Sequence, residues 1–234
     1  MADQNSQDPS IQDIKNHQRV NDILLGPLER PALQFFARHM PAWVTPDKLT
    51  TLGLLGSVLI FASYILTRLD PAFLWLASLG FVINWFGDSL DGTLARYRNI
   101  QRPIYGFFVD HSLDAISETL IFIGLGLSHY VRLDLALLAL VGYLLLSILV
   151  YIRTCVDGVF KISYGKLGPT EVRLLAIIAN TVLFFSSNST WETSAGPFGI
   201  YDLFVIGVSI LLYGFFLSTT IEEIRRLRHV DGQA

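Results

Sequence analysis

The chain has 234 residues, of which 52% are hydrophobic and 16% charged, and its mean hydropathy of +0.48 is too high for an ordinary soluble domain. Its net charge of −3 carries little information, because the distribution of Lys and Arg matters more in membranes, and we expect no nucleic-acid partner. The single cysteine, Cys155, excludes an intrachain disulfide and a cysteine-based zinc site, so we interpret it as a helix-packing residue.

The N-terminal part of the chain divides into a polar segment and a short apolar pattern. Residues 1–26 are predicted to form a polar tail because of their polar composition. The first 20 residues lack the apolar core of a signal peptide, so we expect membrane insertion to rely on the internal spans. In residues 27–40, Leu28, Phe35 and Phe36 recur near one helical face, which predicts an amphipathic helix in the membrane interface. Docking of the same face onto a helix bundle would produce an identical pattern, so both interpretations stay open.

The remainder of the chain consists of apolar stretches separated by short polar connections. A membrane-spanning helix needs about 20 predominantly apolar residues. We therefore predict an all-α integral membrane protein with six transmembrane helices in one domain, residues 27–224, followed by a basic tail, residues 225–234. The predicted spans are residues 49–67, 72–94, 105–131, 135–155, 171–187 and 203–221. The fifth of these spans is short compared with the usual length of about 20 residues.

The positive charges predict how these spans are oriented. If the N-terminus lies in the cytoplasm, all of the 17 Lys and Arg residues except Arg68 and Arg132 fall on the cytoplasmic side. By the positive-inside rule, both termini are predicted to be cytoplasmic. A bacterial or archaeal inner (cytoplasmic) membrane is the expected location, and the glycosylation sequon Asn188-Ser189-Thr190 is expected to be unused.

Four carboxylates stand beside two of the most apolar stretches. Asp88 and Asp91 are three residues apart and share one helical face, as do Asp110 and Asp114, which are four apart. Each Asp near the centre of a membrane helix costs about 2.5–3.5 kcal/mol, so this group needs compensation. Two helices that each present a carboxylate pair make an oxygen-rich site of the kind that divalent cations prefer. The acids therefore predict a metal site at the cytoplasmic end of the bundle.

The spacing of these acids resembles a family signature. The pattern is Asp-x-x-Asp-Gly-x-x-Ala-Arg, a gap, and Gly-x-x-x-Asp-x-x-x-Asp, and all eight fixed positions are filled here by DSLDGTLAR, nine residues and GFFVDHSLD. It is typical of the CDP-alcohol phosphotransferases (CDP-alcohol phosphatidyltransferases), membrane enzymes that transfer a phosphate-bearing group from a CDP-linked donor to an alcohol and release CMP. A polyanionic donor would be repelled by four carboxylates unless cations invert the local charge. The resemblance thus implies two divalent cations, Mg²⁺ or Mn²⁺, held by Asp88, Asp91, Asp110 and Asp114.

The resemblance also implies contacts to the donor within the signature. Gly92 and Arg96 are expected to contact the CDP moiety, although Arg96 in the membrane interface would also be explained by snorkelling. Ala95 and Gly106 lack bulk, which would let the nucleotide approach the backbone of the two helices. Many relatives carry Ser or Thr six residues after the signature arginine, whereas this chain departs from that pattern with Arg102, so the resemblance does not imply that contact here.

A second element upstream resembles a donor-binding segment of the same family. It consists of Pro46, Asp47 and Thr50, which lie near the nucleotide in relatives. A helix cap explains the same residues, because Thr45 or Asp47 would accept a backbone N–H and Pro46 suits the first turn. Both interpretations can hold together. One turn before the signature, Asn84 either orients Asp88, binds substrate or forms helix–helix hydrogen bonds.

Two residues compete for the role of general base toward the attacking alcohol. In most relatives the fourth acid, here Asp114, is the proposed proton acceptor. His111 directly follows Asp110, and this variant resembles the choline/ethanolamine phosphotransferases, in which a His assisted by a Glu is a candidate base. The downstream Gly168-Pro169-Thr170-Glu171 resembles their Gly-Pro-x-Glu element, which makes Glu171 the candidate partner of His111. An interfacial hydrogen bond would also explain the histidine.

The donor determines which substrate carries the lipid. We favour transfer of a phosphatidyl group from CDP-diacylglycerol, because the chain is short for the eukaryotic branch of the family. The alternative is a CDP-choline or CDP-ethanolamine donor that meets a diacylglycerol-like alcohol, with His111 as base. A proton-coupled transporter is a more remote alternative, since acids and a His also occur inside transporter bundles. Membrane lipids and a second copy of the chain, in a homodimer, are the expected partners.

Overall fold

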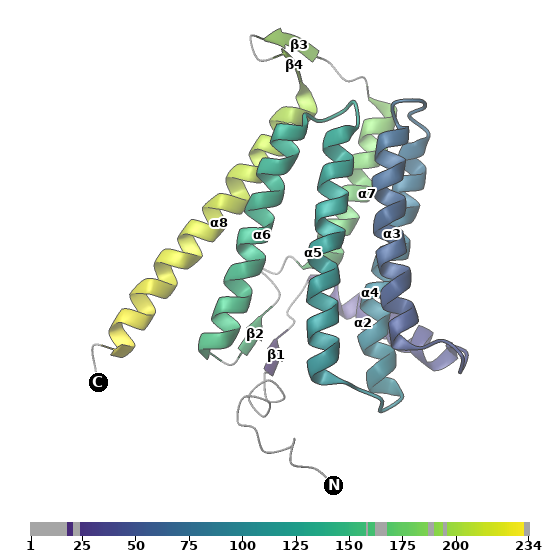
Figure 1. Cartoon of the computed structure of the whole chain (residues 1–234), viewed down its shortest axis with the longest axis vertical. Helices are drawn as coiled ribbons and strands as arrows, with labels where there is room; N and C mark the ends of the chain where they lie inside the picture. The colour runs from purple at the N-terminus through teal and green to yellow at the C-terminus, as the bar shows by residue number, and fades with distance from the viewer. Residues whose placement is uncertain are drawn as a thin grey trace.

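A computed structural model describes residues 18–20, 24–157, 159–161, 168–186, 190–193 and 196–231. Within these ranges the chain is nearly all-helical, with seven helices, most of which run side by side along the long axis of the molecule (Figure 1). The predicted all-α class is therefore confirmed in its main feature. The helices are α2 (Gly26–His39), α3 (Pro46–Leu66), α4 (Phe73–Tyr97), α5 (Pro103–Leu127), α6 (Leu133–Asp157), α7 (Pro169–Phe185) and α8 (Ile200–Asp231).

Two short sheets, which the sequence did not predict, accompany the helices. Strand β1 (Gln18–Val20) pairs in parallel with β2 (Val159–Lys161), so part of the predicted polar tail is a strand. Strand β3 (Thr190–Thr193) pairs with β4 (Gly196–Gly199) as an antiparallel hairpin, in which Gly196 adopts a φ of +99°. Residues 1–17, 21–23 and 232–234 of the predicted tails, and Asn188 and Ser189 of the sequon, lie outside the described residues.

Four of the helices are long and apolar enough to cross a membrane, and they correspond to the first, second, fourth and sixth predicted spans. Helices α5 and α7 differ from them for two physical reasons. Asp110, Asp114 and Glu118 all lie in α5, and α7 has only 17 residues. The structure supports an integral membrane protein, and the six-span count stays a prediction.

The pairing of α3 with α4 depends on glycine. A Cβ atom added at Gly56 would lie 2.6 Å from the backbone nitrogen of Asn84, and one added at Gly80 would lie 2.7 Å from Cγ1 of Ile60. No side chain fits at these distances, so the two helices approach each other at backbone distance. A similar contact joins α5 to α3 beside Ile60, where a Cβ at Gly124 would meet Cα of Phe61 at 2.8 Å.

Helix α2 lies against the outside of the bundle, on α4. Leu33 and Ala37 are buried in a cluster with Leu49, Leu90 and Leu94, and Phe36 packs edge-on against Phe86 with ring centroids 5.4 Å apart. The predicted helix at residues 27–40 therefore exists, and docking accounts for its buried face. Leu28 and Phe35 remain 76% and 58% exposed, so α2 also presents an apolar surface away from the bundle.

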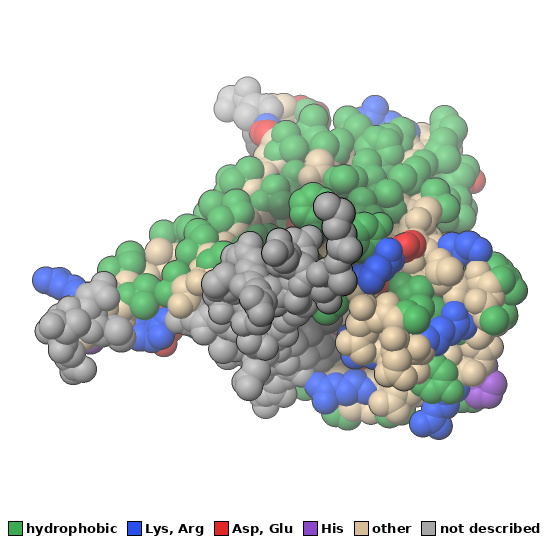
Figure 2. All heavy atoms as spheres, turned by 60° about the horizontal axis from the view of Figure 1, so that its bottom comes forward, with side chains coloured by type: hydrophobic (Ala, Val, Ile, Leu, Met, Phe, Trp, Pro, Cys, Tyr) green, Lys and Arg blue, Asp and Glu red, His purple; other side chains and the backbone are tan. Residues whose placement is uncertain are grey.

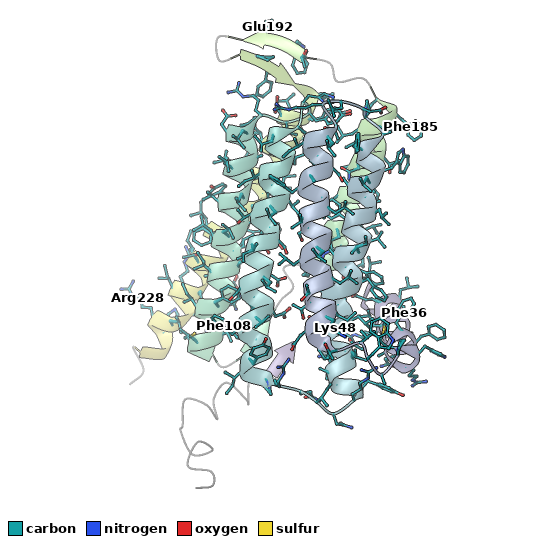
Figure 3. All side chains as sticks on the ribbon, turned by 45° about the vertical axis from the view of Figure 1, so that its right-hand side comes forward. Phe36, Lys48, Phe108, Phe185, Glu192 and Arg228 are labelled. Carbon is teal, nitrogen blue, oxygen red and sulfur yellow. The ribbon has the colours of Figure 1, made fainter. Side chains whose placement is uncertain are left out.

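The two ends of the bundle differ in charge. Lys and Arg side chains gather at the end formed by the start of α3, the end of α4 and the start of α5, beside a mainly hydrophobic flank (Figure 2). Exposed residues of this group are Lys48, Arg96 and Arg102. Lys48 and Phe108 lie toward this end, whereas Phe185 and Glu192 lie toward the other (Figure 3). The predicted asymmetry of positive charge is thus present along the bundle axis.

Candidate active site

A small cleft at the basic end brings together polar side chains from three helices. Thr50 of α3, Asn84 and Asp88 of α4, and Asp110 and Asp114 of α5 all line it. These contacts exist because the close α3–α4 pairing places the first turns of α3 beside the last turns of α4, and α5 then runs back alongside α3. Three of the four acids predicted to hold metal therefore face one cavity, and the fourth is joined to it through Thr50.

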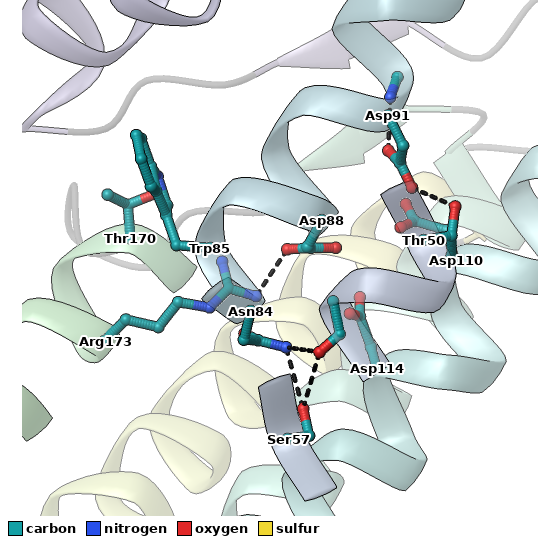
Figure 4. A network of polar contacts seen from close by, with 12 residues as sticks. Thr50, Ser57, Asn84, Trp85, Asp88, Asp91, Asp110, Asp114, Thr170 and Arg173 are labelled. Atoms are coloured by element: carbon teal, nitrogen blue, oxygen red, sulfur yellow. Dashed lines mark hydrogen bonds and ion pairs between the residues drawn. The ribbon is translucent and has the colours of Figure 1, made fainter. Parts of the chain in front are cut away.

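Asp91 is held by neighbours on two elements. Its Oδ2 accepts a hydrogen bond from Oγ1 of Thr50 at 2.6 Å (Figure 4), and its Oδ1 accepts one from the backbone N–H of Gly92. Both donors fix the direction of the carboxylate relative to α3. The hydrogen bond from Thr50 thereby brings the Pro46–Thr50 element into contact with the signature. In the sequence these were two separate motifs.

Asp88 is paired with an arginine that the sequence analysis did not place in the site. Nη2 of Arg173, on α7, lies 2.6 Å from Oδ2 of Asp88, and the two side chains are only 14% and 22% exposed (Figure 4). Nη1 of Arg173 is buried without a hydrogen-bond partner among the described residues. The sequence did hold a signal, because an Arg at the start of an apolar helix is costly unless it is paired.

Asp110, His111 and Asp114 form a second group on the first turns of α5. Nδ1 of His111 lies 3.8 Å from Oδ2 of Asp110 and 3.9 Å from Oδ2 of Asp114. One ligand atom from each of the three side chains lies within 4.8 Å of the others, close enough to hold one cation. Carboxylate oxygens and an imidazole nitrogen suit Mn²⁺, and the carboxylates alone suit Mg²⁺. The donor set therefore fits a divalent cation, with His111 as a member that the predicted ligand set lacked.

Aromatic rings fix the orientation of His111. Its ring stacks on Tyr151 of α6 with centroids 5.2 Å apart and an angle of 28°, and it meets Phe107 edge-on at 4.2 Å. The imidazole is consequently held between α5 and α6 beside the two acids. This position suits proton transfer at the site and is more specific than the interfacial hydrogen bond considered as an alternative.

The residues around Pro46 serve as a helix cap, as one interpretation predicted. Oγ1 of Thr45 accepts the N–H of Lys48 at 3.3 Å, and Pro46 occupies the first turn of α3. Asp47 forms an ion pair with Arg102, whose guanidinium lies 4.2 Å from the ring centroid of Tyr105. Arg102, where the sequence departs from many relatives, thus links the start of α3 to the start of α5. Donor binding by this element stays a prediction.

Glu171 and Asn84 are both engaged in structural hydrogen bonds. Glu171 is 4% exposed; its Oε2 accepts the N–H of Gly168 at 2.9 Å and its Oε1 accepts the N–H of Leu25 at 2.7 Å. Nδ2 of Asn84 donates to the carbonyl of Gly53 at 3.0 Å and to Oγ of Ser57 at 2.9 Å. Glu171 therefore caps α7 and ties it to α2, and Asn84 joins α4 to α3. Assistance of His111 by Glu171 stays a prediction.

The small residues of the signature lie at the open side of the site. A Cβ added at Gly106 would meet nothing within 4 Å, so this glycine leaves space rather than packing against another helix. A Cβ at Gly92 would meet only the mobile end of Arg96, at 3.3 Å. Arg96 is exposed, and its Nη2 donates to Oγ1 of Thr93 at 3.1 Å. Gly92, Ala95, Arg96 and Gly106 are thus accessible from the basic end, as contact with a nucleotide would require.

Comparison with known proteins identifies the family. Residues 43–214 match the CDP-alcohol phosphatidyltransferase family, so the chain belongs to it, as the signature predicted. The chain is 29% identical to cholinephosphotransferase 1 of Bos taurus over 180 residues, which cover 70% of this chain and 43% of the relative. It is 34% identical to archaetidylinositol phosphate synthase of Methanothermobacter thermautotrophicus over 165 residues, which cover 70% of this chain and 80% of the relative. The chain spans about half the length of the cholinephosphotransferases that it matches.

Proposed function

We propose that this protein is a membrane enzyme of phospholipid synthesis that transfers a phosphatidyl group from CDP-diacylglycerol to an alcohol and releases CMP. The observation that carries the proposal is the cleft in which Asp88, Asp110 and Asp114 converge at the basic end of an apolar bundle. Such a site suits a donor whose diphosphate is anionic and whose lipid stays in the membrane. A relative that this chain matches over most of its length, an archaetidylinositol phosphate synthase, favours the same class of reaction.

In this proposal the four acids of the signature hold two divalent cations, Mg²⁺ or Mn²⁺. Bound cations of this kind neutralise the diphosphate and stabilise CMP as the leaving group. Thr50, which lines the cleft, and the N–H of Gly92 fix the Asp91 carboxylate beside it. Arg173 offsets part of the charge of Asp88 before the donor arrives. Gly92, Ala95, Arg96 and Gly106 border the space that the cytidine nucleotide would occupy.

The attacking alcohol must lose its proton to a side chain in the cleft or beside it. A carboxylate oxygen of Asp114 lies at the cleft wall and serves as acceptor in the primary proposal. His111 is the second candidate, because its imidazole lies beside both acids of α5 and is held there by Tyr151 and Phe107. That second candidate corresponds to a CDP-choline or CDP-ethanolamine donor and a diacylglycerol-like acceptor, a reading supported by the similarity to cholinephosphotransferase 1.

The membrane arrangement forms part of the same proposal. Helices α3 to α8 would each cross the membrane, with the basic end, the cleft and both termini on the cytoplasmic side, and α2 in the interface. The positive charges at the end of the bundle that holds the cleft support this orientation. A homodimer in a bacterial or archaeal inner membrane also forms part of the proposal.

The test is release of CMP by purified protein supplied with Mg²⁺ or Mn²⁺. CDP-diacylglycerol and CDP-choline are offered in parallel, CDP-diacylglycerol with a mixture of polar alcohols and CDP-choline with diacylglycerol. Metal-dependent CMP release from CDP-diacylglycerol is the expected result. Release from CDP-choline alone would favour the second candidate. If folded protein releases no CMP from either donor, the proposal is rejected and a transporter, which needs no CDP compound, is favoured.

A further inference from the structure

The carboxylate of Glu29, in the first turn of α2, joins two helices of the bundle. Its Oε1 accepts a hydrogen bond from Nε1 of Trp85 on α4 at 2.8 Å and one from Oγ1 of Thr170 on α7, also at 2.8 Å. Trp85, Thr170 and Arg173 lie close together where α4 meets α7 (Figure 4). One oxygen atom of a helix outside the bundle therefore bridges the two helices from which Asp88 and Arg173 project.

The two anchors of this bridge lie next to the ion pair of the candidate active site. Asp88 follows Trp85 by three residues, and Arg173 follows Thr170 by three residues. Residues three apart on a helix share a face, about one turn from each other. Since α4 and α7 run antiparallel, the Asp88–Arg173 pair and the Glu29 bridge cross each other, and each anchor of the bridge lies one turn from one member of the ion pair.

A second contact ties α2 to the start of α7. The backbone N–H of Leu25, next to the start of α2, donates to Oε1 of Glu171 at 2.7 Å. Glu171 also accepts the N–H of Gly168 and is almost fully buried, so it cannot shift without loss of the α7 cap. The first turn of α7 is therefore fixed by α2 on two sides, through Thr170 and through Glu171.

We propose that α2 is a positioning element, and that Glu29 sets the register of α7 against α4 so that Arg173 stays paired with Asp88. Glu29 is a positioning residue in this assignment and touches neither donor nor acceptor. The assignment rests on the proposed metal site at Asp88. This assignment gives α2 a function in the candidate active site, beyond a position in the membrane interface.

The proposal predicts the sign of an effect on metal binding. A guanidinium on Asp88 is a positive charge beside a metal ligand, so it opposes the binding of a divalent cation. If Glu29 keeps that charge in place, its removal lets Arg173 move away and makes metal binding tighter. General loosening of the bundle would do the opposite, because it would disperse the ligands. Tighter binding is therefore a result that a merely structural role for Glu29 does not give.

The experiment measures Mn²⁺ affinity of the purified full chain, without substrate, from the electron paramagnetic resonance signal of free Mn²⁺. We expect Arg173→Gln to tighten Mn²⁺ binding about tenfold and Glu29→Ala about threefold, from the loss or displacement of one charge. The double variant should match Arg173→Gln alone, because both changes act on one guanidinium. Thr170→Val removes only one hydroxyl donor and should show a smaller change of the same sign. Gln34→Ala, at an exposed position on α2, is the matched control and should leave binding unchanged.

Weaker or unchanged Mn²⁺ binding in both Glu29→Ala and Thr170→Val would overturn the positioning role, as would independent effects that multiply in the double variant. Thr170→Val keeps the test decisive if Glu29→Ala does not fold, because it retains the Trp85 bond and the packing of α2. The wild-type protein separates this proposal from the proposed activity. If it binds Mn²⁺ and shows the expected changes but releases no CMP, the activity fails and the positioning role stands.

Discussion

The two carboxylate pairs of the site are held in different ways. Asp88 and Asp91 on α4 each have a partner from another helix, Arg173 on α7 and Thr50 on α3. The pair on α5 instead surrounds an imidazole from its own helix, at 3.8 and 3.9 Å. The first pair therefore depends on how α3, α4 and α7 pack, whereas the second depends on the local turn of α5. Substitutions at the α4 pair and at the α5 pair should therefore impair the site for different reasons.

The largest effect is expected at the α4 pair. Asp91→Asn should lower CMP release on the order of a thousandfold or more, because it removes a carboxylate on which several kcal/mol of metal catalysis depend. The amide can still accept the Thr50 hydroxyl, so the melting temperature should change little. Asp134→Asn, whose carboxylate contacts Arg132 and the N–H of Leu135 near the start of α6, is the matched control. Retained turnover in Asp91→Asn would remove the acid from the metal site.

The α5 pair should respond differently to loss of the acid and loss of the imidazole. We expect Asp114→Asn to lower CMP release about a hundredfold, the lower range of general base catalysis, and His111→Ala to lower it less, because Asp114 is the proton acceptor in the primary proposal. Rates are measured across pH, with donor binding and Mn²⁺ binding followed in parallel. If His111→Ala instead abolishes turnover with both ligands still bound, the imidazole is the base and the CDP-choline candidate gains support.

A moderate effect is expected at Arg173, the partner of Asp88. Arg173→Gln should raise the KM of the CDP-linked donor about tenfold, because the Asp88 charge near the anionic diphosphate is then no longer offset, a loss of roughly 1.5 kcal/mol. Arg173→Lys keeps the positive charge but lacks the planar guanidinium, so its KM should lie between those of the wild type and Arg173→Gln. Steady-state measurement of kcat and KM checks this. An effect on kcat alone would show that Arg173 does not contribute to donor binding.

The smallest effect on catalysis is expected from the α3–α4 contact, which acts through stability. Gly56→Ala places a methyl group 2.6 Å from the nitrogen of Asn84 and should destabilise the fold by about 1–3 kcal/mol, the usual cost of overpacking. Gly214→Ala in α8 is the control, because a Cβ there meets nothing within 4 Å. Thermal unfolding in detergent compares the two. Equal melting temperatures would contradict the close approach of α3 to α4.

Much of this arrangement could be predicted from short-range patterns. Apolar length located the helices, and the spacing of Asp88, Asp91, Asp110 and Asp114 identified the family and the end of the bundle that holds the site. The Arg173–Asp88 pair could not be predicted, because it joins residues 85 positions apart and depends on the packing of α7 against α4. The same holds for the bridge at Glu29, whose two partners lie 56 and 141 positions away. Contacts of this kind have no periodicity that a single sequence reveals.

The two ends of α5 have a consequence for motion. At its distal end Gly124 lies against the backbone of Phe61, so that end cannot move relative to α3 without a clash. Near its start, Gly106 has open space around it, Phe108 is 70% exposed, and the link to α3 is the exposed Arg102–Asp47 ion pair, which costs little to break. We therefore expect α5 to pivot about its distal end, so that Asp110 and His111 travel farther than Asp114 or Ser117. Entry of a bulky donor would then be accommodated by a swing of one helix, with α3 and α4 acting as the fixed wall.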